Sequence, residues 1–102
     1  MKEYNKLVRN RIPEIITGDN KKPITHVASE KEFENALVDK LTEEVNEYKS
    51  SGDLEELVDI MEVVEAIGYL KGVSLGELNK LKRKKANKRG SFSKRIILER
   101  VK

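Results

Sequence analysis

Two short stretches, Leu41–Tyr48 (LTEEVNEY) and Glu55–Glu62 (EELVDIME), decide how this chain folds. Each stretch sets carboxylates three residues apart among apolar residues at helical spacing, and such residues share one face of a helix. The intervening residues, Lys49–Asp53, are few enough to turn the second helix back against the first. The sequence therefore predicts an antiparallel helical hairpin that points carboxylates into one space. They are Glu44 and Glu47 on the first helix, and Glu56 and Asp59 on the second.

The positions of these carboxylates set them apart from ordinary surface charges. Glutamate is a strong helix former, and most Glu-x-x-Glu pairs are simply solvated. In the first helix, however, the apolar stripe through Phe33 and Leu37 reaches Glu44 where the period requires a core residue. In the second helix, Glu56 and Asp59 begin the inward stripe itself. Inward carboxylates need a cation, and hard oxygen ligands suit Mg²⁺ or Mn²⁺.

Length and composition narrow the class of protein. The chain has 102 residues, which suits one modest domain spanning residues 1–102. It contains no cysteine, so disulfides and thiolate zinc sites are excluded, and its one histidine, His26, cannot form a His-rich metal site. No apolar run is long enough for a membrane helix, and the charged start does not resemble a signal peptide. We therefore expect a cytoplasmic protein without a membrane partner.

Charge is distributed very unevenly along the chain. Residues 30–65 contain 13 acidic and 3 basic residues, a balance of −10, whereas residues 80–102 contain 11 basic and 1 acidic, a balance of +10. An acidic middle and a basic end can hold a metal and an anion side by side. A basic end can also bind nucleic acid, but only Phe92 adds an aromatic ring there, which weakens that interpretation.

Capping signals predict a mainly α-helical fold. A short helix should include Pro13 in its first turn and end near Gly18. Three longer helices should follow: from the capping box at Ser29 to about Tyr48, from Asp53 to about Leu70, and from the capping box at Ser74 to Gly90. Residues 23–28, which include His26, and residues 92–101 are partly β-branched and are interpreted as extended strands, the second pairing with residues 24–28 in a short two-stranded β element.

The predicted helix over residues 54–70 is apolar on several sides. Its large aliphatic residues cannot all face one neighbour within a chain of this length; they include Ile60, Met61, Val63, Val64 and Ile67. A helix that is apolar all round is usually buried. We therefore expect a second copy of the chain to complete an antiparallel helical bundle, as a homodimer or a dimer of dimers. The alternative is that the N-terminal segment and the two strands cover this helix.

Three motifs, in sequence order, carry a resemblance to a known family. The first is Asn5–Pro13 (NKLVRNRIP), which differs at two positions from the family's Asn-Lys-Leu-Val-Arg-Asp-Lys-Ile-Pro. The second is Glu-Glu-x-x-Glu at residues 43–47, followed by Glu-x-x-Asp at residues 56–59, and the third is Lys88–Phe92 (KRGSF). The chain resembles the MazG-like, all-α nucleoside triphosphate pyrophosphohydrolases along nearly its whole length. More narrowly, it resembles their phosphoribosyl-ATP pyrophosphohydrolase-like branch.

This resemblance implies a hydrolase acting on phosphoric anhydride bonds. Such an enzyme converts a nucleoside triphosphate to the monophosphate and pyrophosphate with Mg²⁺, through attack of metal-activated water on the α-phosphorus. The expected catalytic metal ligands are Glu44, Glu47, Glu56 and Asp59, with Glu43 and Glu62 as neighbours that ligate occasionally. The expected phosphate contacts are Lys85, Lys88 and Arg89, with Lys6 and Arg9 as further candidates for the same task.

A different class of function remains open on the sequence. The chain could be a non-enzymatic helical dimer that binds nucleic acid or a protein partner through its basic C-terminal region. Its acidic cluster would then be purely structural. Pyrophosphate that appears from a nucleotide when Mg²⁺ is added, and is lost with EDTA, discriminates the enzyme from the binding protein.

Overall fold

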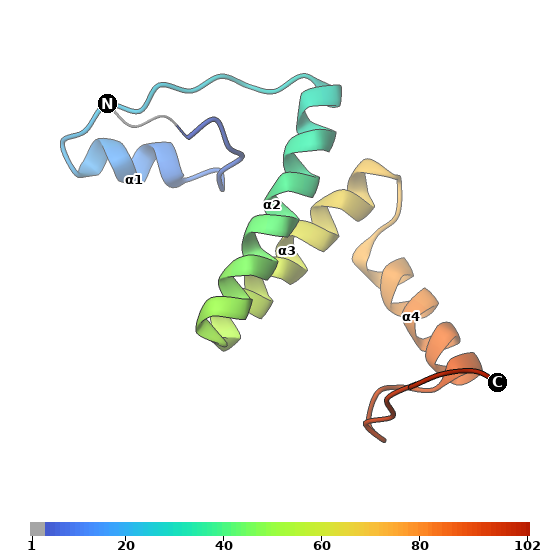
Figure 1. The fold of residues 1–102 in the computed structure, drawn as a ribbon. Helices are drawn as coiled ribbons and strands as arrows, with labels where there is room; N and C mark the ends of the chain where they lie inside the picture. The colour runs from blue at the N-terminus through green and yellow to red at the C-terminus, as the bar shows by residue number, and fades with distance from the viewer. Residues whose placement is uncertain (1–3) are drawn as a thin grey trace.

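The computed structural model describes residues 4–102 of the chain; residues 1–3, the first residues of the charged start discussed above, lie outside it. The described part contains the α-helices α1 (Ile12–Gly18), α2 (Glu30–Ser51), α3 (Leu54–Leu70) and α4 (Leu75–Arg89) (Figure 1). The prediction of a mainly α-helical chain is confirmed. None of the helices in residues 4–102 is long and apolar enough to cross a membrane.

Local capping fixes the hairpin of α2 and α3. The Ser29 hydroxyl accepts a hydrogen bond from the Glu32 backbone N–H at 3.2 Å and so begins α2 where the capping box predicts. Gly52 ends α2 in the left-handed region (φ 69°), which a glycine adopts without steric cost, and its N–H donates to the Tyr48 carbonyl at 2.8 Å. Asp53 then occupies the N-cap position of α3 without a side-chain capping bond.

The core lies between the two helices of this hairpin. Figure 1 shows α2 and α3 side by side and antiparallel, with α4 leaving from the end of α3 that lies away from the Gly52 turn. Leu37 of α2 and Val63 of α3 are the buried apolar side chains of the described residues. Gly68, also buried, lets α4 approach α3 through Leu78. So small a core leaves much of the apolar surface of both helices exposed.

The predicted two-stranded β element is wrong, because residues 4–102 form no strand. Residues 21–29 run as an extended connection from α1 to α2, with Ile24 and Val27 exposed by 85% and 97%. Residues 96–102 are likewise irregular and exposed. Each segment has strand-like composition but no neighbour to pair with, and an isolated two-stranded pairing is at best marginally stable. His26 therefore lies in a connection and not in a strand.

A substitution at Gly68 tests the packing of α4 on α3. An alanine Cβ at this position would lie 2.9 Å from Leu78 Cδ1 and 3.0 Å from the Val73 carbonyl oxygen. The Leu78 methyl group can rotate aside, but the Val73 carbonyl belongs to the backbone and accepts no such movement cheaply. We expect this clash to exceed the roughly 1 kcal/mol that alanine gains over glycine in a helix, so Gly68→Ala should lower the free energy of unfolding by about 1–2 kcal/mol. Gly76→Ala is the matched control, since its nearest neighbour would be the Ser74 hydroxyl at 3.8 Å. Thermal unfolding followed by circular dichroism measures both, and a Gly68→Ala variant as stable as the control would contradict this packing.

Candidate metal centre

Three carboxylates from α2 and α3 meet where the two helices pack. Glu44 is on the face of α2 that packs toward α3 and is only 6% exposed, as the apolar stripe of α2 predicts. Glu56 lies in the first turn of α3, and Asp59 lies one turn further along the helix. One carboxylate oxygen from each of these residues lies within 4.8 Å of the others. The structure therefore brings together three of the four predicted ligands.

The Glu44 carboxylate is incompletely compensated. Its Oε1 lies 3.5 Å from the Lys40 ammonium, whereas its buried Oε2 has no hydrogen-bond partner among the described residues. Burial raises the pKa of Glu44, and the nearby charge of Glu47 raises it further. A buried carboxylate oxygen without a donor is costly. Hard divalent cations bind carboxylate oxygens of this kind, so Mg²⁺ or Mn²⁺ fits the group formed by Glu44, Glu56 and Asp59.

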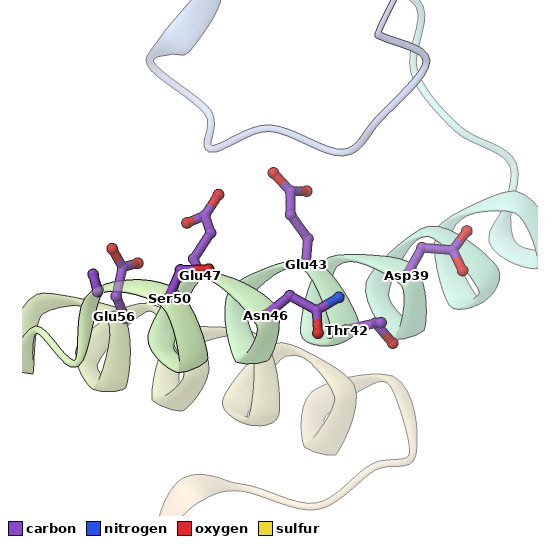
Figure 2. A pocket seen from close by; sticks show the side chains of 8 residues that line it. Asp39, Thr42, Glu43, Asn46, Glu47, Ser50 and Glu56 are labelled. Atoms are coloured by element: carbon purple, nitrogen blue, oxygen red, sulfur yellow. The ribbon is translucent and has the colours of Figure 1, made fainter.

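Glu47 lies beside this group rather than inside it. Its side chain is exposed, and the three-carboxylate group does not include it. Partial burial raises the pKa of Glu56, and the charge of Glu47 and a hydrogen bond with it raise that pKa further. Figure 2 shows Glu47 and Glu43 rising from the same side of α2, with Glu56 next to Glu47. Glu47 therefore lies next to the three-carboxylate group, beside Glu56.

An open hollow of about 720 Å³ runs along this side of the hairpin (Figure 2). Its lining is polar and acidic: Asp39, Thr42, Glu43, Asn46, Glu47, Ser50, Ser51 and Glu56. The hollow is shallow and wide open to solvent, and it is not an enclosed cleft of the kind that buries most of a small-molecule ligand. It borders two of the predicted metal ligands, Glu47 and Glu56.

Two cations of the N-terminal segment reach the acidic residues. The Lys6 ammonium lies 3.0 Å from Glu43 Oε1, and this hydrogen bond raises the pKa of Lys6. The pKa of Glu43 is lowered in spite of its partial burial, because Lys6 and Lys40 both lie against it. The Arg9 guanidinium donates from Nη2 to Asp59 Oδ1 at 2.7 Å, and its Nη1 lies 4.0 Å from Glu62 Oε1. Arg9 therefore contacts the three-carboxylate group through Asp59, whereas Lys6 contacts Glu43, the neighbour of Glu44 in the sequence.

The predicted phosphate contacts of α4 lie elsewhere in the chain. Lys85, Lys88 and Arg89 are exposed on the second half of α4, which packs on α3 alone among the helices. Figure 1 shows α4 extending away from the end of the hairpin that carries the acidic cluster. None of the three forms an ion pair with any carboxylate in residues 4–102. Within one chain these three cations therefore lie apart from the carboxylates of this site.

Lys40 is a site residue that the sequence analysis missed. Its ammonium lies 3.4 Å from Glu43 Oε2 and 3.5 Å from Glu44 Oε1, and it is mostly buried. Its spacing from these residues, i to i+3 and i to i+4, is the signal that would have found it. His26 also has a carboxylate partner, Glu32 at 2.9 Å, but the pair is exposed and lies at the start of α2.

Comparisons of the chain with protein-family models, with curated proteins and with solved structures find no match. The resemblance to the MazG-like pyrophosphohydrolases therefore stays a prediction from three motifs.

Neutralising Glu44 should stabilise the metal-free protein. Because the pKa of Glu44 is raised in the folded state, its negative charge lowers the stability of the fold at neutral pH. This destabilisation disappears as the pH falls through the raised pKa and the carboxylate takes up a proton. Glu44→Gln should therefore raise the melting temperature in EDTA by a few degrees at neutral pH, with a smaller difference at acidic pH.

Glu43, the neighbour of Glu44 in the sequence, provides a control for which we expect the opposite change in melting temperature. The lowered pKa of Glu43 means that its charge stabilises the fold at neutral pH, a contribution that is lost as the pH falls through the lowered pKa. Glu43→Gln should therefore reduce the melting temperature at neutral pH. If Glu44→Gln destabilised the metal-free protein as much as Glu43→Gln did, the description of Glu44 as an uncompensated buried charge would be wrong.

Proposed function

We propose that this chain is a Mg²⁺-dependent hydrolase that converts a nucleoside triphosphate or a related nucleotide to the monophosphate and pyrophosphate. The observation that supports this most is the buried Glu44 carboxylate, which belongs to the group with Glu56 and Asp59 and keeps one oxygen without a hydrogen-bond partner among the described residues. A merely structural acidic cluster would be expected to satisfy its buried oxygens with donors of the chain itself. The second of the three sequence motifs, at residues 43–47 and 56–59, contains the same three residues.

The metal would be held by Glu44, Glu56 and Asp59, joined by Glu47 from the adjacent turn of α2. Glu43 and Glu62 lie next to these ligands and would support or occasionally replace them. When bound, the metal supplies charge neutralisation at the phosphate oxygens and lowers the pKa of a bound water. Mn²⁺ suits the same oxygen ligands.

The residues of the chain would act mainly by positioning and by electrostatics. In the reaction a water oxygen bonds to the α-phosphorus and gives up its protons to solvent, the bond from that phosphorus to the α,β-bridging oxygen breaks, and pyrophosphate leaves with the electron pair of that bond. Phosphoryl chemistry of this kind needs no covalent nucleophile from the protein. Lys6 and Arg9 lie at the edge of the cluster, where their charges can hold the β- and γ-phosphates. The adjacent hollow would accept the rest of the nucleotide.

We also infer that two copies of the chain, or two such pairs, form the active assembly. In one chain α3 exposes an apolar face with i, i+3 and i+4 spacing: Leu54, Leu57, Val58, Met61 and Val64. The hairpin partner α2 adds exposed Val38, Val45 and Tyr48. Burying each large aliphatic side chain contributes about 1.5–3 kcal/mol. A second hairpin packed on this surface would complete a four-helix bundle.

Assembly would also give α4 a role. Because α4 points away from the cluster of its own chain, Lys85, Lys88 and Arg89 could hold phosphates only at the cluster of another copy.

The same exposed cations favour a second candidate function, binding of nucleic acid or a protein partner by a non-enzymatic dimer. In that case Lys88→Ala and Arg89→Ala would weaken DNA binding and leave nucleotide turnover unaffected.

Replacing the proposed ligands tests the hydrolase directly. Asp59→Asn and Glu47→Gln should each lower Mg²⁺-dependent pyrophosphate release by at least about 100-fold, because loss of a metal ligand removes several kcal/mol of transition-state stabilisation. Glu34→Gln, an exposed carboxylate of α2 outside the cluster, is the matched control and should keep full activity. The assay is release of pyrophosphate from a panel of canonical and modified triphosphates, with and without EDTA. Full activity in the Asp59 and Glu47 variants would refute this ligand assignment.

Sedimentation tests the assembly. At micromolar concentration the wild type should sediment at twice the chain mass or more. Met61→Asp, which places a charge at the centre of the apolar face, should shift the protein to monomers and reduce its activity. Val27→Asp, on the exposed connection before α2, should leave the assembly intact. A folded and active wild-type monomer at this concentration would contradict the inference.

A further inference from the structure

The N-terminal segment, residues 4–11, crosses the acidic side of the hairpin and is tied to it by two ion pairs. Lys6 pairs with Glu43 of α2, and Arg9 pairs with Asp59 of α3. The two anchors therefore span both helices of the hairpin. One of the anchors, Asp59, belongs to the three-carboxylate group that fits a divalent cation. The segment thus holds the candidate metal centre by one of its own ligands.

The side chain of Arg9 has no polar contact in the described residues apart from this centre. Its guanidinium reaches Asp59 Oδ1 at 2.7 Å and approaches Glu62 Oε1 at 4.0 Å. Its backbone makes only a local contact, since the Arg9 carbonyl accepts a hydrogen bond from the Ile12 N–H at 3.1 Å at the start of α1. About half of the Arg9 side chain is exposed. The guanidinium can therefore change partners while the Lys6–Glu43 pair still holds the segment on α2.

A divalent cation and Arg9 compete for Asp59. A metal ion held by Asp59 would lie a few ångströms from the guanidinium, and like charges at such distances repel appreciably even with solvent present. The carboxylate cannot give its full charge to both partners. Metal binding should therefore weaken the Arg9–Asp59 pair, and the pair should weaken binding of metal alone.

A triphosphate removes this conflict. It brings negative charge to the metal, and the planar guanidinium fork matches phosphate oxygens in a bidentate way. Arg9 already lies at the cluster, so a rotation of its long side chain suffices to leave Asp59 for a phosphate on the same metal. Lys6 is less suited to this exchange, because its partner Glu43 lies outside the three-carboxylate group.

We propose that Arg9 is an exchanging residue of this site: it occupies Asp59 in the metal-free protein and transfers to the phosphates of the nucleotide when metal and nucleotide bind together. This inference rests on the proposed function. Arg9 thereby disfavours metal without substrate and favours metal with substrate. Metal and nucleotide should bind cooperatively as a result, each strengthening the binding of the other.

Calorimetric titrations with metal alone and with metal plus a non-hydrolysable triphosphate separate the two roles of Arg9. Arg9→Ala should bind Mg²⁺ or Mn²⁺ alone more tightly, by about threefold to tenfold, because a competing charge is removed. The same variant should bind the triphosphate analogue with metal at least about tenfold more weakly, because a charge-assisted contact is lost. Arg9→Lys should restore the weaker metal binding but only part of the triphosphate affinity.

Arg11→Ala is the matched control. Arg11 lies in the same segment and carries the same charge, but its ion pair is with Glu14 at 3.4 Å, within its own short stretch of chain. Arg11→Ala should change neither the affinity for metal alone nor the affinity for the triphosphate analogue with metal. An effect that comes from net charge alone would appear in this variant as well. Weaker or unchanged metal binding in Arg9→Ala would overturn the proposal, as would an unchanged affinity for the triphosphate analogue.

These titrations need no turnover, so they separate this proposal from the hydrolase. Suppose that Arg9→Ala shows opposite changes in the two affinities while the wild type releases no pyrophosphate from any triphosphate. The proposed exchange of Arg9 would then be supported, and the proposed hydrolase activity would be wrong. If the wild type releases pyrophosphate while Arg9→Ala binds metal as the wild type does, the hydrolase holds and the exchange fails.

Discussion

A buried carboxylate at a helix–helix contact is the constraint on which the rest of this structure depends. Glu44 occupies a position of α2 that faces α3, where an apolar residue would pack more favourably. Glu56 and Asp59 add two further carboxylates to the same space. Like charges in a partly desolvated site repel, and one Glu44 oxygen has no donor within residues 4–102. The hairpin is therefore built around a charge that the chain itself does not fully balance.

Nearby cations compensate part of the negative charge of this carboxylate cluster. Lys40 reaches Glu44 from one turn earlier on α2, and Lys6 and Arg9 approach from the N-terminal segment. These cations offset part of the negative charge of the metal-free hairpin, although Lys6 and Arg9 are half-exposed and each such pair contributes little to stability. The exposed apolar face of α3 indicates where the remaining stability would come from if a second hairpin covers it.

Sequence reasoning found the hairpin and its carboxylates because both depend on local rules. The Ser29 capping box and Gly52 fix where the helices begin and end, and the helical period alone places Glu44 inside. The contact of Arg9 with Asp59, fifty residues away in the sequence, depends on tertiary packing that no period encodes. The prediction of strands was wrong for a related reason, because the β-branched composition of residues 23–28 does not supply a strand with which they could pair.

Crystals of the wild-type protein soaked in Mn²⁺ test the central claim, that these carboxylates form a divalent-cation centre. Anomalous scattering locates the ion without reference to any activity. We predict one or more manganese peaks within coordination distance of Glu44, Glu56 and Asp59, with the Glu44 oxygen that lacks a partner as a ligand. No peak at this cluster under saturating Mn²⁺, with the cluster open to solvent in the crystal, would contradict the account.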